Sequence, residues 1–126
     1  AVPELNAHAM GLPYLEYLLR DTASSVLIGR DRMVPVTVPH AGWFCLHKLA
    51  LYSLRTGADN PKREKDVFQA AVLAQTLMHK SDFLLLEAVE GMDSKLKTRV
   101  RAGAKRALAL LGEGAPETSS VLEKLA

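Results

Sequence analysis

The 126-residue chain has few of the features that identify a function from composition. It contains one cysteine, six per cent aromatic residues and a formal net charge of only +2. A single cysteine excludes a disulfide scaffold, and eight glycines and six prolines without a period exclude collagen-like classes. The small net charge does not by itself indicate a nucleic-acid partner. The 48% of hydrophobic residues is enough for the core of one domain, which we expect to span residues 1–126.

Long apolar runs are also missing. A membrane-spanning helix needs about 20 apolar residues in a row, but Gln69 and Gln75 interrupt one stretch and Glu87 and Glu90 interrupt another. The first ten residues lack the basic and continuous apolar regions of a signal peptide. The unpaired Cys45 lies in an apolar helical pattern and is expected to pack rather than to react. Together these features predict a cytoplasmic protein without a membrane partner.

Two short β-branched runs predict a β-hairpin over residues 25–38. Ser25–Gly29 and Met33–Val38 flank the turn, and Val residues alternate in the second run. Pro35 cannot donate a ladder hydrogen bond, so the second strand should be an edge or expose that position. Since a lone two-stranded hairpin is marginal in water, either the helices of the chain cover it or its sheet partners lie outside this chain.

Helical periodicity dominates the remainder, residues 39–126. Gly57, Asn60 and Pro61 supply a helix stop, a cap and a first helical residue between two of these helices. The predicted fold is mainly α, an α+β fold with a bundle of about five helices and one small N-terminal β-hairpin. A short leading helix is expected over 11–20, and the others over 39–55, 61–80, 83–89, 93–111 and 116–126.

Residues able to carry chemistry are sparse. The four histidines are scattered, without the i, i+4 pairing of a helical metal site, and there is no cysteine pair. His47 lies on an apolar helix and is interpreted as a hydrogen-bonded core histidine rather than a ligand or base. No Gly-rich phosphate loop and no Gly-x-Ser-x-Gly elbow occurs in the sequence. The chain therefore offers no catalytic residue and no metal ligand.

The most informative charges surround Asp66, which borders the apolar stripe of the longest predicted helix. A buried carboxylate needs a cationic partner, because an unpaired buried charge is costly. Lys48 and Arg55 are the candidates, and antiparallel helices should place Asp66 closer to Arg55. One interpretation is a structural ion pair that locks two helices. The alternative is a positive surface for a phosphate-bearing ligand held elsewhere in a larger protein, formed by Lys48, Arg55, Arg63 and Lys65.

A second cluster makes the helix expected over 93–111 basic. Lys97, Arg101 and Lys105 line up at i, i+4 and i+8. Stacked like charges are mildly unfavourable on a helix, so solvent or an anionic partner must offset them. A solvated outer face is the simpler interpretation. Nucleic-acid contact is the functional one, and the lack of interleaved aromatic residues weakens it.

The order of these segments resembles the C-terminal part of a bacterial nucleotidyltransferase-like family of the DNA polymerase β superfamily. That family has a leucine-rich helix, a hairpin, a proline followed by [FY]-x-x-H-K-L, and then [KR]-x-x-K-D. Here Phe44–Leu49 and Lys62–Asp66 fit the last two pieces. The resemblance runs from Leu12 to Leu111, and its most specific parts are His47-Lys48-Leu49 and Lys65-Asp66.

The resemblance implies transfer of a nucleotide from an NTP to an acceptor. In the family, a Gly-Ser followed by an Asp-x-Asp pair holds the divalent metal that orients the triphosphate. This sequence contains neither motif, so we expect it to be the C-terminal portion of a longer parent and inactive alone. Mg²⁺ and NTP are then ligands of the parent, and its upstream core is the partner of this chain. Lys48, Lys65 and Asp66 would support the nucleotide site or fix the helical part beside it.

A function of another class stays open. The chain would then be a non-enzymatic helical module that binds a protein or a nucleic acid through the basic helix 93–111. Steeply salt-dependent binding of the isolated chain to duplex DNA would separate this interpretation from the transferase one.

Overall fold

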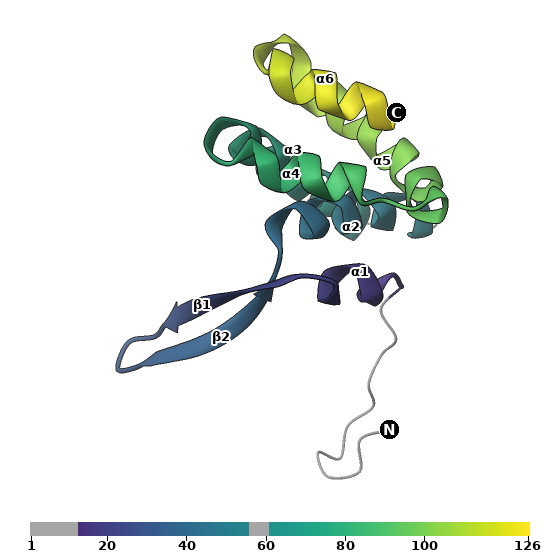
Figure 1. Cartoon of the computed structure of the whole chain (residues 1–126). Coiled ribbons are helices and arrows are strands. Elements are labelled where there is room, and N and C mark those ends of the chain that lie inside the picture. Colours follow the sequence, from purple (N-terminus) through teal and green to yellow (C-terminus); the bar gives the residue numbers. More distant parts are fainter. Residues whose placement is uncertain (1–12, 56–60) are drawn as a thin grey trace.

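The computed structural model describes residues 13–55 and 61–126. The fold is mainly α with one antiparallel hairpin, as predicted (Figure 1). The elements in chain order are α1 (Leu15–Leu19), β1 (Thr22–Ile28), β2 (Met33–Pro39), α2 (Ala41–Leu54), α3 (Pro61–Lys80), α4 (Asp82–Glu90), α5 (Ser94–Leu111), a 3-10 turn (Gly112–Gly114) and α6 (Pro116–Leu125). Helix α3 begins at the predicted proline. The stop and cap predicted at Gly57 and Asn60 lie outside the described residues.

Helix α2 is the centre of the helical body. It packs against α1, α3, α4 and α5, which explains why its sequence is apolar around most of its circumference. Leu46 and Leu49 are fully buried, and so is Cys45, whose Sγ donates to the Ala70 carbonyl oxygen at 3.5 Å. Burial raises the pKa of the Cys45 thiol to about 12. The prediction that this cysteine packs in the core is confirmed.

Two glycines let the helices approach α2 at backbone distance. Gly103 of α5 faces Leu49, and a Cβ added at Gly103 would overlap the Leu49 carbonyl oxygen. In the same way, a Cβ on Gly42 of α2 would overlap the carbonyl oxygen of Leu84 on α4. These contacts fix where α4 and α5 cross α2, because no side chain stands between the backbones.

A buried tyrosine of α1 packs against the helical body. Tyr17 is 2% exposed and stacks on Trp43 with ring centroids 6.1 Å apart. Its hydroxyl donates to Asp93 Oδ2 at 2.6 Å, while Asp93 Oδ1 caps α5 by accepting from the Leu96 N–H. Arg20 covers the Tyr17 ring at 4.8 Å and lies 3.8 Å from Asp93. Burial and the Asp93 hydrogen bond raise the pKa of Tyr17 to about 12.

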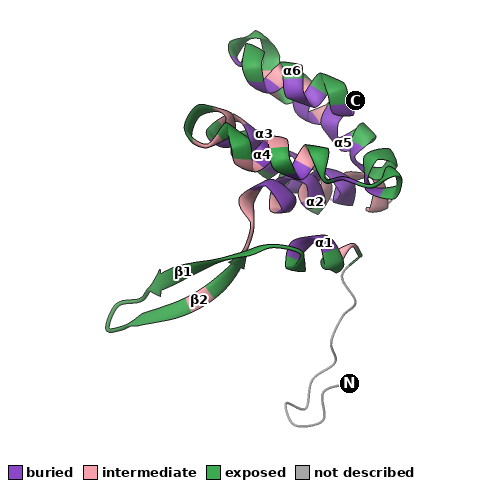
Figure 2. Cartoon of the chain, viewed as in Figure 1, coloured by how far each residue is buried: buried purple, intermediate pink, exposed green. Residues whose placement is uncertain are grey.

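The hairpin projects from this body and is exposed along nearly its whole length (Figure 2). Its register pairs Thr22 with Pro39 and Ile28 with Met33, so it is longer at its base than the predicted 25–38. The first three residues of β1 are polar or small, and the apolar pattern alone does not mark them as strand. The alternative that the helices of the chain cover the hairpin is wrong for the described residues.

Replacing Gly103 by alanine is expected to destabilise the fold. The gain of about 1 kcal/mol in helix propensity is outweighed by overpacking against the Leu49 backbone, giving a net loss of at least about 1 kcal/mol. Urea denaturation followed by circular dichroism measures the loss. Gly114→Ala is the matched control, since an added Cβ there meets no atom within 4 Å. Equal stabilities of the two variants would contradict the close crossing of α2 and α5.

Candidate functional site

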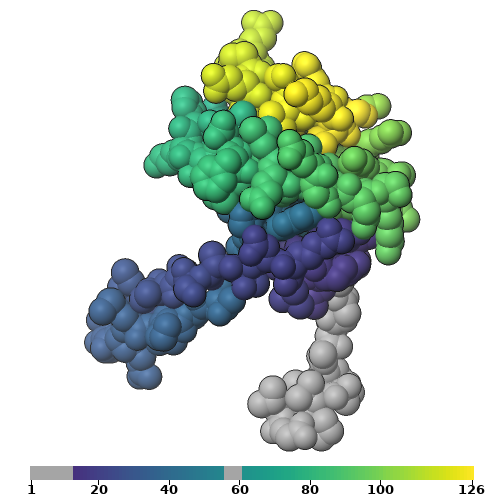
Figure 3. Space-filling view, in the orientation of Figure 1, coloured from purple at the N-terminus to yellow at the C-terminus, as the bar shows by residue number. Residues whose placement is uncertain are grey.

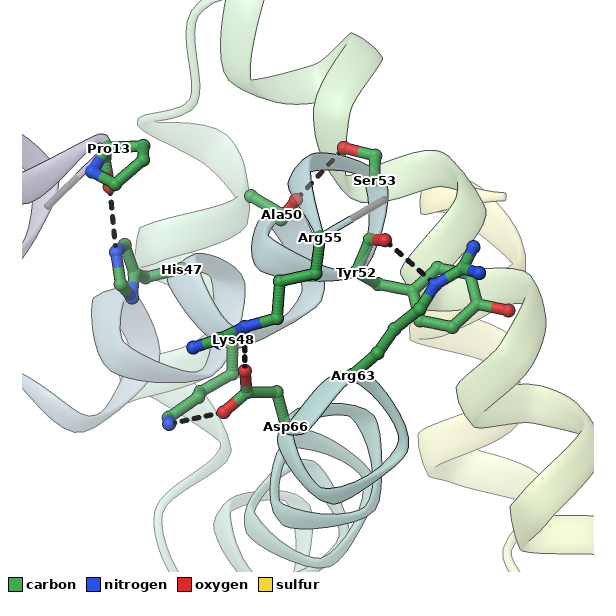
Figure 4. A network of polar contacts seen from close by, with 9 residues as sticks. All are labelled: Pro13, His47, Lys48, Ala50, Tyr52, Ser53, Arg55, Arg63 and Asp66. Atoms are coloured by element: carbon green, nitrogen blue, oxygen red, sulfur yellow. Dashed lines mark hydrogen bonds and ion pairs between the residues drawn. The ribbon is translucent and has the colours of Figure 1, made fainter. Parts of the chain in front are cut away.

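Asp66 lies at the centre of a small ionic cluster between α2 and α3 (Figure 4). Asp66 as a whole residue is 4% exposed. Lys48 Nζ donates to Oδ1 at 2.7 Å, and Arg55 Nε lies 2.7 Å from Oδ2. The Arg55 contact is an ion pair without hydrogen-bond alignment, because neither of its two atoms has a hydrogen-bond partner. We call Lys48, Arg55 and Asp66 the Asp66 cluster.

The local sequence places the two cations on one side of α2. Lys48 lies on α2 and Arg55 is the C-cap residue of this helix, about two turns further on, and both side chains reach Asp66 near the start of α3. The expectation that Asp66 lies closer to Arg55 than to Lys48 is wrong, since both contacts measure 2.7 Å. The reason is the long aliphatic stem of Lys48, which carries its ammonium group to the carboxylate, 5.4 Å from the centroid of the Phe44 ring.

The Asp66 cluster holds two positive charges and one negative charge. Its carboxylate side chain is 6% exposed, whereas the side chains of Lys48 and Arg55 are 18% and 30% exposed. The buried charge is therefore the paired one, and the surplus positive charge lies toward solvent. Chemically, the arrangement ties α2 to α3 and leaves a cationic edge that an anion can approach.

The other two predicted cations lie outside the cluster. Arg63 donates from Nε to the Tyr52 carbonyl oxygen at 3.1 Å, and its guanidinium lies 3.8 Å from the Tyr52 ring centroid. Lys65 is exposed and makes no hydrogen bond or ion pair with the described residues. The structure therefore brings together three of the five predicted residues, and of the five only Lys65 makes no polar or aromatic contact within residues 13–55 and 61–126.

Sequence reasoning missed an ion pair on the opposite side of α3. Arg106 of α5 contacts Glu64 Oε2 through both Nε and Nη2, at 3.0 and 2.9 Å. The two residues are 42 positions apart, and nothing in their local pattern marks them as partners. Both side chains are more than two-fifths exposed, so the pair orients α3 and α5 more than it stabilises them.

His47 lies in the core, as predicted, but only one of its two ring nitrogens has a hydrogen-bond partner among the described residues. It is 4% exposed, and its Nε2 lies 3.1 Å from the Pro13 carbonyl oxygen. A carbonyl only accepts, so Nε2 carries the proton. Desolvation lowers the pKa of His47 below 6.5, Lys48 lowers it further, and the Pro13 contact acts against this. The neutral ring joins the segment before α1 to α2.

The basic face of α5 is divided between internal contacts and solvent. Three of its cations contact their own chain: Lys95, Arg99 and Arg106. Three others are exposed on successive turns: Lys97, Arg101 and Lys105. Lys97 and Arg101 line a shallow depression with Glu90 and Lys124, so an acid already lies among these cations. The structure leaves three of the six basic residues available to an anionic partner.

The described residues do not form a metal centre. In the ranges 13–55 and 61–126, no group of three or more His, Cys, Asp or Glu side chains could hold a metal ion. Within the same ranges, no helix combines the length and the apolar character that crossing a bilayer requires.

Comparison with known proteins places these features in a family. The model of a family described as nucleotidyltransferase matches residues 1–92, which is 92 of the 126 residues, and the chain belongs to this family. The match includes the hairpin and the Asp66 cluster and ends before α5. No curated protein sequence and no solved structure matches the chain.

Removing the charge of Asp66 is expected to weaken the fold. Breaking a buried pair costs about 3–5 kcal/mol, and the partial exposure of Lys48 and Arg55 reduces this, so Asp66→Asn should lose about 2 kcal/mol of unfolding free energy. Urea denaturation of the 126-residue chain measures it. Lys65→Met, one residue away and exposed, is the control and should change stability by less than about 0.5 kcal/mol.

A double-mutant cycle distinguishes loss of the ion pair from general disruption of α3. Lys48→Met should cost less in the Asp66→Asn background than in the unmodified chain, because the charge it pairs with is already gone. Strictly additive losses would contradict a direct Lys48–Asp66 interaction.

The lowered pKa of His47 predicts a loss of stability on acidification. The unfolded state takes up a proton near pH 6.5 while the folded state resists it, so stability is full above that pH and falls below it. For a single proton the slope is at most about 1.4 kcal/mol per pH unit. Denaturation between pH 7.5 and 5 should show this loss of stability in the unmodified chain and in the exposed control His79→Gln. A slope of the same size in His47→Gln would assign the effect to another group.

Proposed function

We propose that the chain is the C-terminal helical portion of a nucleotidyltransferase that transfers a nucleotide from an NTP to an acceptor. The family match over residues 1–92 carries this proposal. The sequence contains no Gly-Ser and no Asp-x-Asp, and the described residues do not form a metal centre. Mg²⁺ and the NTP are therefore assigned to an upstream core of the same protein, and this chain alone does not catalyse transfer.

The candidate residues divide into supporting and contacting roles in this proposal. The Asp66 cluster is a positioning element, because its carboxylate is buried and already paired with Lys48 and Arg55. Lys65 is the residue free to contact a phosphate, since it is exposed on the turn of α3 beside the cluster. A phosphate bound at Lys65 would lie beside the Asp66 cluster, whose surplus positive charge favours anion binding. Arg63 stays a neighbour, held by Tyr52.

The experiment is thermal denaturation of the protein expressed from its complete reading frame, with and without a magnesium nucleotide. A nucleotide at 100 times its Kd adds about 2.7 kcal/mol of stability to the folded state, so the melting temperature of the parent should rise. The 126-residue chain should show no shift. Lys65→Met should reduce the nucleotide-induced rise in melting temperature but leave the melting temperature without nucleotide unchanged. Asp66→Asn should lower the melting temperature even without nucleotide.

Two results would contradict the proposal. One is a complete reading frame without a Gly-Ser and Asp-x-Asp upstream of this chain. The other is stabilisation of the isolated chain and of the parent to the same extent by magnesium nucleotide, because the site would then lie within these residues.

The second candidate function is binding of a protein or nucleic acid by α5. The observation in its favour is the line of exposed cations Lys97, Arg101 and Lys105, and the family match does not extend to them. Binding of the isolated chain to duplex DNA, with affinity falling steeply as salt increases, would favour this function over the first.

A further inference from the structure

The hydrogen-bond pattern of the hairpin determines which backbone groups face outward. Gly29 donates its N–H to the Arg32 carbonyl at 2.9 Å, and His40 donates to the Asp21 carbonyl at 3.0 Å. In an antiparallel pair, hydrogen-bonded and non-hydrogen-bonded residue pairs alternate. With the observed register, the non-hydrogen-bonded pairs are Thr22–Pro39, Ser24–Thr37, Val26–Pro35 and Ile28–Met33. The backbone groups of these residues point away from the partner strand.

The two outer edges of the hairpin therefore differ. On β2, two of the four outward positions are Pro35 and Pro39, which have no N–H to donate. This edge cannot form a regular ladder with another strand, a device that proteins use to end a sheet. On β1, all four outward residues keep their N–H, so this edge presents a complete set of donors and acceptors. Only β1 is able to accept a further strand along its length.

Both faces of the hairpin are apolar and exposed. One face carries Ile28 and Met33, which are 77% and 72% exposed, and the other carries Leu27 and Val34, which are 63% and 41% exposed. Figure 3 shows the hairpin as an arm separate from the helical body. Strands that are apolar on both faces are typical of sheets covered on both sides by helices. The hairpin of a second copy, paired with this one, would add strands to the sheet but leave both of its apolar faces in water.

The apolar surface continues from the hairpin onto the helices. Val38 and Pro39 line a shallow pocket with Phe44 and Leu73, and an adjoining pocket contains the 60% exposed Phe68. A partner that covers the Val34 face of the hairpin therefore meets a second apolar surface at its base. This continuity favours a folded domain over an isolated extended peptide as the partner.

We propose that the outer edge of β1 pairs, through Ser24, Val26 and Ile28, with an edge strand of an upstream α/β sheet of the same protein. The hairpin then completes that sheet, with β2 as its outermost strand, and elements of the upstream part cover both apolar faces. This inference rests on the proposed function. It adds which edge of the hairpin pairs with the upstream sheet and in which order the strands follow.

Amide hydrogen exchange, followed residue by residue, tests the inference. In the isolated 126-residue chain, the outward amides of Ser24, Val26 and Ile28 should exchange as rapidly as those of Met33 and Thr37. In the protein from the complete reading frame, the exchange of the three β1 amides should be slower by at least about 100-fold. These amides would then exchange only when the sheet itself opens. The amides of Met33 and Thr37 should remain rapid.

Proline substitution supplies a matched pair of variants. Val26→Pro and Thr37→Pro each remove an outward N–H, and neither removes a hydrogen bond between β1 and β2. In the full protein, Val26→Pro should lower the melting temperature clearly more than Thr37→Pro. In the isolated chain the two variants should differ little. A larger effect of Thr37→Pro in the full protein would place the partner strand on β2 and overturn the assignment.

The outcomes separate this inference from the proposed function. If the full protein binds magnesium nucleotide and its β1 amides still exchange rapidly, the transferase assignment stands and the strand order is wrong. If the complete reading frame has no upstream sheet, the proposed partner is absent and both fail. Protection of the β1 amides in the isolated chain that increases with protein concentration would identify a second copy as the partner and overturn the inference.

Discussion

The burial of α2 is the constraint on which the rest of the structure depends. A helix that is apolar around most of its circumference has to be surrounded, and α1, α3, α4 and α5 do so. Backbone contacts at Gly42 and Gly103 set the distances to α4 and α5. Once α3 lies against α2, Asp66 is enclosed, and the carboxylate is tolerated because Lys48 of α2 and its C-cap residue Arg55 pair with it. The ionic cluster is thus a consequence of the packing.

This origin bears on how the charges in the segments that carry the family resemblance are interpreted. The pieces that carry the resemblance, Phe44–Leu49 and Lys62–Asp66, are also the pieces that join α2 to α3. Their histidine and aspartate are buried, and their lysines differ, since Lys48 is paired and Lys65 is exposed. A short motif can therefore combine a fold-stabilising contact with a group that is available to a ligand.

Local pattern was sufficient to predict the helices, the hairpin and the need of Asp66 for a cation, because each depends on neighbours in the sequence or on the cost of burying a charge. It was insufficient for contacts set by tertiary geometry. The Tyr17–Asp93 hydrogen bond joins residues 76 positions apart, and Gly103 carries no signal that a carbonyl group faces it. Lys48 and Arg55 both lie 2.7 Å from the Asp66 carboxylate. This equality depends on side-chain conformations, which sequence periodicity does not describe.

The base of the hairpin is connected to the helical body through the residues that flank its two strands. Arg20, just before β1, contacts Asp93 and the Tyr17 ring, and His40, between β2 and α2, donates its N–H to the Asp21 carbonyl. The hydrogen bond of His40 closes the base of the hairpin, and this residue alone separates β2 from α2. A strand that pairs with β1 would therefore take its direction from α2, because so short a connection couples the orientation of the hairpin to that helix.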